Sequence, residues 1–303
     1  MKELTALAGR NLKIYLRDKS AVFFSLLSTI IVIALMILFL GDMNINAITK
    51  NLSEMNIGSP EQNQKNAELF IFMWTISGIL CVNSVTVPLM ITSIMINDFA
   101  GGQLQSFRTT PVSRIKLSLS YILASWIASA LICVITLIVS EIIAFMNGAV
   151  LPDIYNHLKL LVMILVNCFT YSGIMYFAGV FVKSAGAWSG FSTLIGTLIG
   201  FLGGIYIPVG ELPESVQTIL KYFPVIHGCS MFRNTLTEKI GDKIFENVPE
   251  QFVKEYYNHM GITIKFNNIN INWQIQLTIL MIFGILFILM SSAIISKRYK
   301  SEK

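Results

Sequence analysis

The stretch AVFFSLLSTIIVIALMILFL, residues 21–40, decides the class of this protein. It runs for twenty residues without an ionisable side chain. An α-helix rises about 1.5 Å per residue, so a run of this length crosses a hydrocarbon core about 30 Å thick. Strands of a membrane barrel would instead alternate apolar and polar residues. The stretch therefore predicts a transmembrane helix.

Five further apolar runs of spanning length follow it. The chain of 303 residues is 54% hydrophobic and 13% charged, and the charged fraction is about half that of an ordinary soluble domain. We predict an all-α integral membrane protein with six transmembrane helices, forming a single transmembrane domain over residues 1–303. The five additional predicted spans are residues 69–96, 117–146, 158–182, 188–207 and 273–296.

The distribution of Lys and Arg predicts the orientation of these helices. With both termini in the cytoplasm, the inner segments hold thirteen basic and four acidic residues, whereas the outer segments hold nine and twelve. Basic residues near helix ends resist translocation. We therefore expect a multi-pass protein of a bacterial cell membrane with both ends inside. The net charge of +5 is then an orientation signal that favours membrane lipids, and no nucleic acid, as partners.

Residues 1–19 predict an amphipathic helix at the inner membrane interface. At about 100° per residue, Lys2, Arg10, Lys13 and Arg17 gather on one side, which we expect to face water. A plain basic leader with accidental periodicity is the alternative. The opposite, apolar face comprises Leu4, Leu7, Ala8, Leu12, Ile14, Tyr15 and Leu16.

Residues 97–116 join the second and third predicted spans on the inner side. Helical propensity resumes after the Gly101-Gly102 pair and Pro111 stops it, which predicts a short helix around 102–109. A rigid helix between two long spans suits a mechanical contact with another protein. An ordinary loop is the alternative.

The inner segment carries Asp98, then Gly101 or Gly102, Leu104, Thr110-Pro111 and Arg114. This pattern resembles the signature of ABC-2 type transporter permeases, the membrane subunits of ABC exporters. That signature places an acidic residue, a glycine, a leucine, Thr-Pro and a basic residue between spans two and three. The resemblance implies that residues 97–116 form a coupling helix that seats in a groove of an ATP-binding subunit. The doubled glycine, and Asp98 where Glu is commoner, depart from the pattern. The residues implied in coupling are Asp98, Gly101, Gly102, Leu104, Arg108, Thr110, Pro111 and Arg114.

The region 208–272 is predicted to hold an outer hairpin followed by an extracellular loop. Pro208 is expected to end the fifth span, and Pro224 to break a short helix that Leu212-Pro213 opens. Interrupted backbone at membrane depth needs protein around it, which predicts a re-entrant hairpin. The same family resemblance implies that it caps the outer end of a pathway. The hairpin residues are Pro208, Glu211, Leu212, Pro213, Phe223 and Pro224.

The role of residues 238–272 stays open between a substrate-specific part and a neutral insertion in a loop that tolerates length. Their first part, 238–257, could form an amphipathic helix outside the membrane. Cys229 is the single cysteine expected outside the spans.

Small residues recur along the fifth span. Glycines about four residues apart let helix backbones approach closely in lipid, and the partner helix could belong to this chain or to another. Polar residues within the other spans, Asn83, Asn167, Thr170 and Ser172, are expected to hydrogen-bond between helices. The predicted packing glycines are Gly186, Gly190, Gly196, Gly200 and Gly204.

The chain has no G-x-x-x-x-G-K-[ST] loop for phosphates, so we do not expect it to be an enzyme. We expect no catalytic residues, no metal site and no bound cofactor. His157, His227 and His259 lack ligand spacing. The resemblance implies that ATP and Mg²⁺ are used by a separately encoded ABC ATP-binding subunit.

The resemblance implies a permease that exports a hydrophobic or amphiphilic substrate, such as a drug, an antimicrobial peptide or a lipid-like molecule. It would act as a homodimer, or as a heterodimer with a related permease, and would contribute to multidrug or antimicrobial peptide resistance. The alternative is an ion-coupled secondary transporter without an ATPase. That class usually needs intramembrane carboxylates or paired broken helices, and the spans offer only Glu141.

Overall fold

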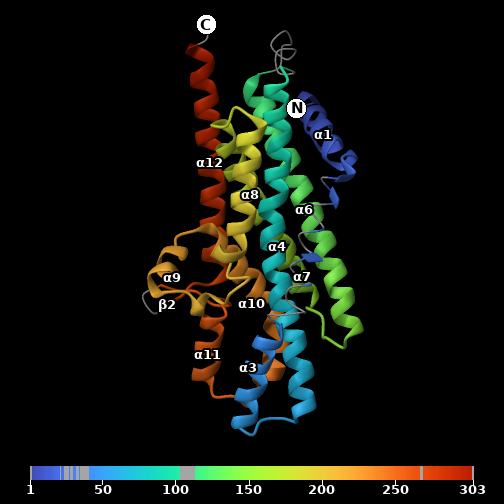
Figure 1. The fold of residues 1–303 in the computed structure, drawn as a ribbon, viewed down its shortest axis with the longest axis vertical. Helices are drawn as coiled ribbons and strands as arrows, with labels where there is room; N and C mark the ends of the chain where they lie inside the picture. The colour runs from blue at the N-terminus through green and yellow to red at the C-terminus, as the bar shows by residue number, and fades with distance from the viewer. Residues whose placement is uncertain are drawn as a thin grey trace.

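The computed structural model describes residues 2–20, 22, 23, 27, 30, 31, 34, 41–102, 113–266 and 269–301 (Figure 1). Most of the first predicted span, 21–40, lies outside these residues. In chain order the elements are α1 (Lys2–Arg17), α3 (Gly41–Glu54), α4 (Pro60–Ala100), α6 (Arg114–Met146), α7 (Ile154–Val180), α8 (Ala185–Leu202), η2 (Val209–Glu211), α9 (Glu214–Leu220), α10 (Pro224–Ile244), α11 (Glu250–His259), β1 (Lys265–Phe266), β2 (Ile269–Asn270) and α12 (Trp273–Ser301).

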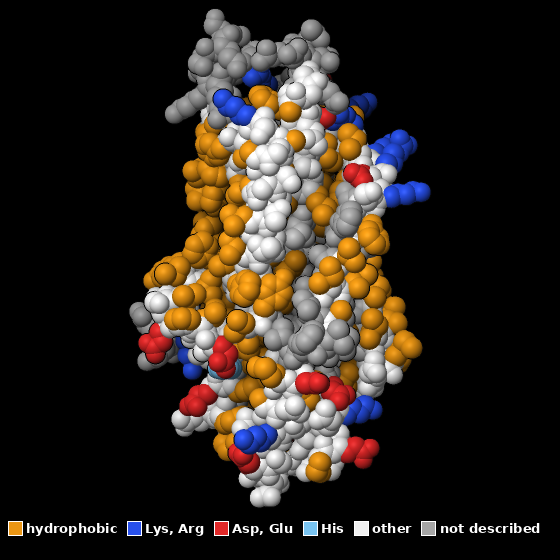
Figure 2. Space-filling model, viewed as in Figure 1, with side chains coloured by type: hydrophobic (Ala, Val, Ile, Leu, Met, Phe, Trp, Pro, Cys, Tyr) orange, Lys and Arg blue, Asp and Glu red, His pale blue; other side chains and the backbone are white. Residues whose placement is uncertain are grey.

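Five of the described helices are long and apolar enough to cross a membrane, namely α4, α6, α7, α8 and α12. They run along the long axis of the molecule, with α1 and the end of α12 at one end and α3 and α11 at the other. Figure 2 shows hydrophobic side chains over the middle of the visible face and charged ones toward its ends. The all-helical membrane class is confirmed, and the sixth span stays a prediction.

Helix α4 is the longest element, with 41 residues, which corresponds to about 60 Å of helix. At its start, the Ser59 side chain accepts a hydrogen bond from the backbone N–H of Gln62, and Pro60 takes the first helical position. The helix is twice as long as a hydrocarbon core is thick. Its polar first turns therefore project beyond the predicted span 69–96.

Polar side chains inside the bundle are paired across helices. Each of the four that the sequence singled out makes a hydrogen bond to a neighbouring helix, so this prediction is confirmed. In lipid such bonds satisfy groups that would otherwise lack a partner. The pairs are Asn83 Nδ2 to Thr136 Oγ1 (3.1 Å), Asn167 Nδ2 to Ser84 Oγ (2.8 Å), Thr170 Oγ1 to the Leu280 carbonyl (2.8 Å) and Ser172 Oγ to Ser125 Oγ (3.0 Å).

The N-terminal helix packs against protein along the face of Ala8, Asn11 and Tyr15, which are buried. Leu16, in the predicted apolar stripe, is 44% exposed. Arg10, expected to face water, points instead toward α4. The prediction of an apolar face in lipid opposite a fully hydrated basic face is therefore wrong in part, because hydrophobic periodicity does not distinguish lipid from a neighbouring helix.

The turn after α8 corrects two expectations. Helix α8 ends at Leu202 with Gly203 as its cap, so Pro208 lies well beyond the helix end and does not terminate it. Gly204, a predicted helix-packing residue, lies in this turn with φ of +62°, a backbone conformation that favours glycine.

Pro224 begins a helix and does not break one. It occupies the first turn of α10, where its missing N–H would have no helical partner. Most residues of α10 are buried, against α4, α7 and α12. The stretch 224–244 is therefore part of the packed bundle, and Cys229, which it carries, is buried and not outside. Pro249 separates α10 from α11, so residues 238–257 form parts of two helices.

All four cysteines are buried and free of disulfides. Cys133 Sγ lies 3.8 Å from Cys168 Sγ, between α6 and α7. Cys81 Sγ lies 3.6 Å from the Val225 carbonyl, between α4 and α10. The cysteines thus serve as apolar packing residues between neighbouring helices.

A buried arginine holds the part of the bundle distant from α1. Arg233 of α10 is 0% exposed, and its guanidinium carbon lies 4.3 Å from the centre of the Trp74 ring. Its Nη2 donates to the Gly204 carbonyl at 2.8 Å, and Trp74 Nε1 donates to the Met260 carbonyl at 2.8 Å. A Cβ added at Gly261 would lie 2.9 Å from Arg233 Nη1. One side chain thus joins α4, α10 and two loops.

We predict that Arg233→Lys lowers the free energy of unfolding by about 1–3 kcal/mol, because lysine cannot both stack as a plane on Trp74 and donate to the Gly204 carbonyl. Thermal unfolding of the purified protein in one detergent measures the difference. Arg17→Lys, at an exposed position on α1, is the matched control. Equal shifts for both variants would contradict the prediction.

Candidate functional site

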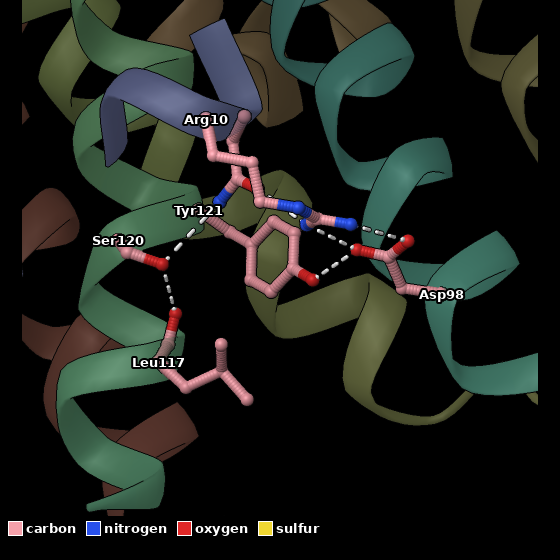
Figure 3. Close-up of polar contacts among 6 residues, drawn as sticks. Arg10, Asp98, Leu117, Ser120 and Tyr121 are labelled. Carbon is pink, nitrogen blue, oxygen red and sulfur yellow. Dashed lines mark hydrogen bonds and ion pairs between the residues drawn. The ribbon is translucent and has the colours of Figure 1, made fainter. Parts of the chain in front are cut away.

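Three helices meet at one carboxylate at the end of the bundle that carries α1 (Figure 3). Arg10 of α1 donates to Asp98 through both terminal nitrogens, Nη1 to Oδ2 at 2.7 Å and Nη2 to Oδ1 at 3.2 Å. Tyr121 of α6 donates its hydroxyl to Asp98 Oδ2 at 2.6 Å. Asp98 itself lies in the last turn of α4. The carboxylate therefore links α1, α4 and α6.

A second layer of contacts holds α1 on α6. Asn11 Nδ2 donates to Ser120 Oγ at 3.3 Å, and Ser120 Oγ donates to the Leu117 carbonyl at 2.6 Å. Lys116 Nζ lies 2.9 Å from Glu3 Oε2. Both Glu3 and Lys116 are about half exposed, so their ion pair contributes little to stability.

The Asp98 contacts are stronger because they are desolvated. Asp98 is 5% exposed, and a bidentate guanidinium–carboxylate pair is short, directional and charge-assisted. The hydrogen bonds that Arg10 donates to Asp98 raise the pKa of Arg10 above its ordinary value, so Arg10 is charged at every physiological pH. Removing Arg10 would leave the buried Asp98 charge without its cation, and an uncompensated buried charge typically costs about 3–5 kcal/mol.

The predicted coupling residues that the structure describes lie at the end of α4 and at the start of α6. Gly101 caps α4 and Gly102 follows with φ of +72°. Arg114 is the first residue of α6. The predicted helix around 102–109 lies almost wholly outside the described residues, as do Leu104, Arg108, Thr110 and Pro111.

Asp98 is thus engaged within the chain, by Arg10 and Tyr121, two residues that sequence reasoning did not assign to this site. The sequence contains one signal that Asp98 has partners: it is an isolated acidic residue at the end of an apolar run. A charge in that place requires a partner, but its identity depends on how α1 lies on α4 and α6.

A cavity of about 400 Å³ lies between α4 and α8. Trp188 Nε1 donates to the Leu89 carbonyl at 3.0 Å across it. The hydroxyl oxygens of Thr86 and Ser192 are buried without a hydrogen-bond partner among the residues that the structure describes. The lining residues are Thr86, Leu89, Met90, Ser93 and Asn97 of α4 and Ala185, Trp188, Ser189 and Ser192 of α8.

The spacing of these residues shows why they share one cavity. On each helix they follow the pattern i, i+3, i+4, i+7, which places them on one face. The face combines aliphatic and aromatic surface with hydroxyl and amide groups. Such a wall accommodates apolar groups and leaves hydrogen-bonding capacity at its two unpartnered hydroxyls.

Helix α8 is largely uncovered in the single chain, because only Trp188, Ile199 and Gly200 are buried. A Cβ added at Gly186, Gly190 or Gly196 would meet no atom within 4 Å, so these three make no close helix contact within the described chain. A Cβ at Gly200 would overlap the Tyr206 ring.

The residues of the predicted outer hairpin form a short, folded-back segment. Pro208 precedes η2 and Pro213 caps α9. His259 Nε2 lies 3.2 Å from Glu211 Oε1, which ties η2 to α11. Gln217 Nε2 donates to the Leu212 carbonyl at 2.7 Å.

Phe223 caps α10 with 47% of its surface exposed. Helix α11 is a neighbour of η2 that the sequence did not predict. Whether they re-enter the membrane stays a prediction.

Glu141, the single carboxylate within a predicted span, lies with Oε1 3.0 Å from His157 Nε2 of α7. Among the described residues, no three His, Cys, Asp or Glu side chains gather as ligands around a metal ion would.

The comparisons with known proteins agree with the helical arrangement. No curated protein matches the chain. A family model described as ABC-2 family transporter protein matches residues 25–293. This range includes the cavity between α4 and α8 and both Asp98 and Tyr121, but not Arg10. The chain therefore belongs to the ABC-2 family of transporter membrane proteins.

Proposed function

We propose that this protein is the permease subunit of an ATP-driven exporter in a bacterial cell membrane, with both termini in the cytoplasm. It pairs with a separately encoded ATP-binding subunit, which uses ATP and Mg²⁺. The supporting observation is the Asp98 junction, which links α1, α4 and α6 at the flanks of the coupling segment 97–116.

The junction explains how a push on one segment moves several helices. Residues 103–112 connect the last turn of α4 to the start of α6, and Asp98 binds both α1 and α6. Closure of the ATP-binding subunits would displace the coupling segment. The ion pair then carries this displacement into α1, α4 and α6 together, so that α4 moves relative to α8.

The cavity between α4 and α8 is the proposed entry to the transport path. A second permease copy, or a related permease, covers the exposed face of α8, where Gly186, Gly190 and Gly196 leave room for close approach. The path then runs between the two halves and opens outward beneath the hairpin at 208–228. The mixed wall suits a hydrophobic or amphiphilic substrate, such as a drug or an antimicrobial peptide, and export would confer resistance to it.

The assembly is tested first by purifying the tagged protein from its native operon in mild detergent. A stoichiometric ATP-binding subunit with ATPase activity supports the proposal. A folded dimeric permease without any ATPase, whose transport depends on a proton gradient, would favour the alternative of an ion-coupled secondary transporter.

We predict that Asp98→Asn lowers ATP-driven transport in proteoliposomes about tenfold, equivalent to about 1.4 kcal/mol of coupling. The neutral amide keeps the shape of the side chain but loses the ion pair to Arg10. ATPase activity of the complex should persist without transport, which distinguishes uncoupling from loss of assembly.

The control for Asp98→Asn is Glu3→Gln, which removes an exposed ion pair between α1 and α6 and should leave transport unchanged. The double variant Arg10→Gln/Asp98→Asn should lose no more than the single Asp98→Asn variant, since both act on one interaction. Additive losses would show that Asp98 acts independently of Arg10.

We predict that Ser189→Leu reduces transport at least about fivefold while ATPase activity remains, because the added methyl groups occupy the cavity between α4 and α8. Transport of a fluorescent amphiphilic dye into inverted vesicles measures the effect. Thr197→Leu, an exposed position on the same helix outside the cavity, is the control. Equal transport by both variants would place the path elsewhere.

A further inference from the structure

A second and larger cavity lies toward the other end of α4. It measures about 670 Å³ and is bounded by the start of α3, the first four turns of α4 and the last turn of α6. A volume of this size is typical of a pocket for a small organic ligand. The lining residues are Asp42, Ile45, Glu61, Gln64, Lys65, Glu68, Leu69, Ile71, Phe72, Thr75, Ile143, Ala144 and Asn147.

One face of α4 forms a wall that changes from charged to apolar. Glu61, Lys65, Glu68, Phe72 and Thr75 all line the cavity and are spaced by four, three, four and three residues, so they share one side of the helix. The stripe is about 21 Å long at 1.5 Å per residue. A ligand along it would meet carboxylates at one end and hydrocarbon at the other.

Among the described residues, no cation forms an ion pair with the acidic groups of the cavity. Asp42 and Glu61 form no ion pair with any residue that the structure describes. Glu68 accepts a hydrogen bond from the neutral Gln64 amide, Nε2 to Oε1 at 2.9 Å.

The one basic lining residue, Lys65, is directed toward the end of α6. A Cβ added at Gly148, just after that helix, would lie 3.3 Å from Lys65 Nζ. The ammonium group thus lies at the negative end of the α6 dipole. Three carboxylates and one ammonium leave the cavity with a negative charge.

The other surfaces of the cavity are hydrophobic. Leu69, Ile71 and Ala144 are buried under it, and Ile143 exposes 40% of its surface. Apolar area of this kind stabilises a hydrocarbon chain when water is displaced. An anionic ligand would be repelled by the carboxylates, and a neutral lipid would gain nothing from them.

We propose that this cavity binds a cationic amphiphile, a molecule that carries one positive charge on a hydrocarbon chain. The ammonium group lies among Asp42, Glu61 and Glu68, and the chain extends along Leu69, Phe72 and Ile143. In the orientation of the proposed exporter the cavity opens on the outer side, separate from the cavity between α4 and α8. The inference that the ligand is an exported substrate rests on the proposed function, whereas its binding does not.

The test uses the permease in nanodiscs of zwitterionic phosphatidylcholine, with radiolabelled dodecyltrimethylammonium below its micelle concentration. Equilibrium dialysis gives the bound fraction after subtraction of empty nanodiscs, and dodecyl sulfate is the probe of equal chain length and opposite charge. We expect saturable binding of the ammonium, at least about tenfold tighter than that of the sulfate.

Two variants identify the site. Glu61→Gln/Glu68→Gln should weaken ammonium binding about tenfold, and Glu61→Lys/Glu68→Lys should invert the preference toward the sulfate. Glu214→Gln/Glu246→Gln, which removes two exposed carboxylates outside the cavity, should change nothing. All these positions are exposed, so each variant should fold.

Binding of both probes with equal affinity, unaffected by the Glu61 and Glu68 variants, would overturn the proposal and leave a non-selective lipid groove. Saturable binding of neither probe would also overturn it. Binding can be measured without the ATPase, so the two proposals fail separately. If the complex shows ATP-driven transport but no ammonium binding, only this inference is refuted. If ammonium binds but no ATPase is found, only the proposed function is refuted.

Discussion

The arrangement of the end of the bundle that carries α1 depends on one buried negative charge. Asp98 occupies the last turn of α4, where the helix dipole disfavours an anion. Its burial adds a desolvation cost that only close donors offset. Arg10 and Tyr121 supply them from two other helices. The charge of Asp98 is unfavourable on α4 alone, and the donors that stabilise it hold α1 and α6 against α4.

A buried positive charge has a similar role in the part of the bundle distant from α1. Arg233 is fully buried; its guanidinium lies on the Trp74 ring and donates to the Gly204 carbonyl, and no described carboxylate lies within ion-pair distance. The ring face and the carbonyl dipole offset part of the desolvation cost, while Nε and Nη1 are buried without a hydrogen-bond partner among the described residues. Helix α4 therefore carries both of these residues, Asp98 in its last turn and Trp74 in its first half, and its length sets the distance between them.

Much of the helical framework was predictable from sequence, because apolar runs of spanning length have few alternatives in lipid. The interhelical roles of Asn83, Asn167, Thr170 and Ser172 followed from the same constraint. Helix α10 was not predictable in this way. Its polar residues, such as Ser230 and Thr237, resemble those of a water-exposed segment, yet they bond to carbonyls inside the bundle. The Arg10–Asp98 pair was missed because periodicity identifies the side on which a charge lies, not what covers that side.

The burial of every cysteine has a practical consequence for following the motions of this protein. Cys81, Cys133, Cys168 and Cys229 are buried between helices, where maleimide reagents have little access to the sulfur atoms. The natural chain is therefore a nearly silent background for site-specific labelling. One cysteine introduced at an exposed position of α1 and one on α8 would carry a pair of spectroscopic labels. The distance between the labels could then be measured through a complete ATP cycle, and no native cysteine would have to be removed first.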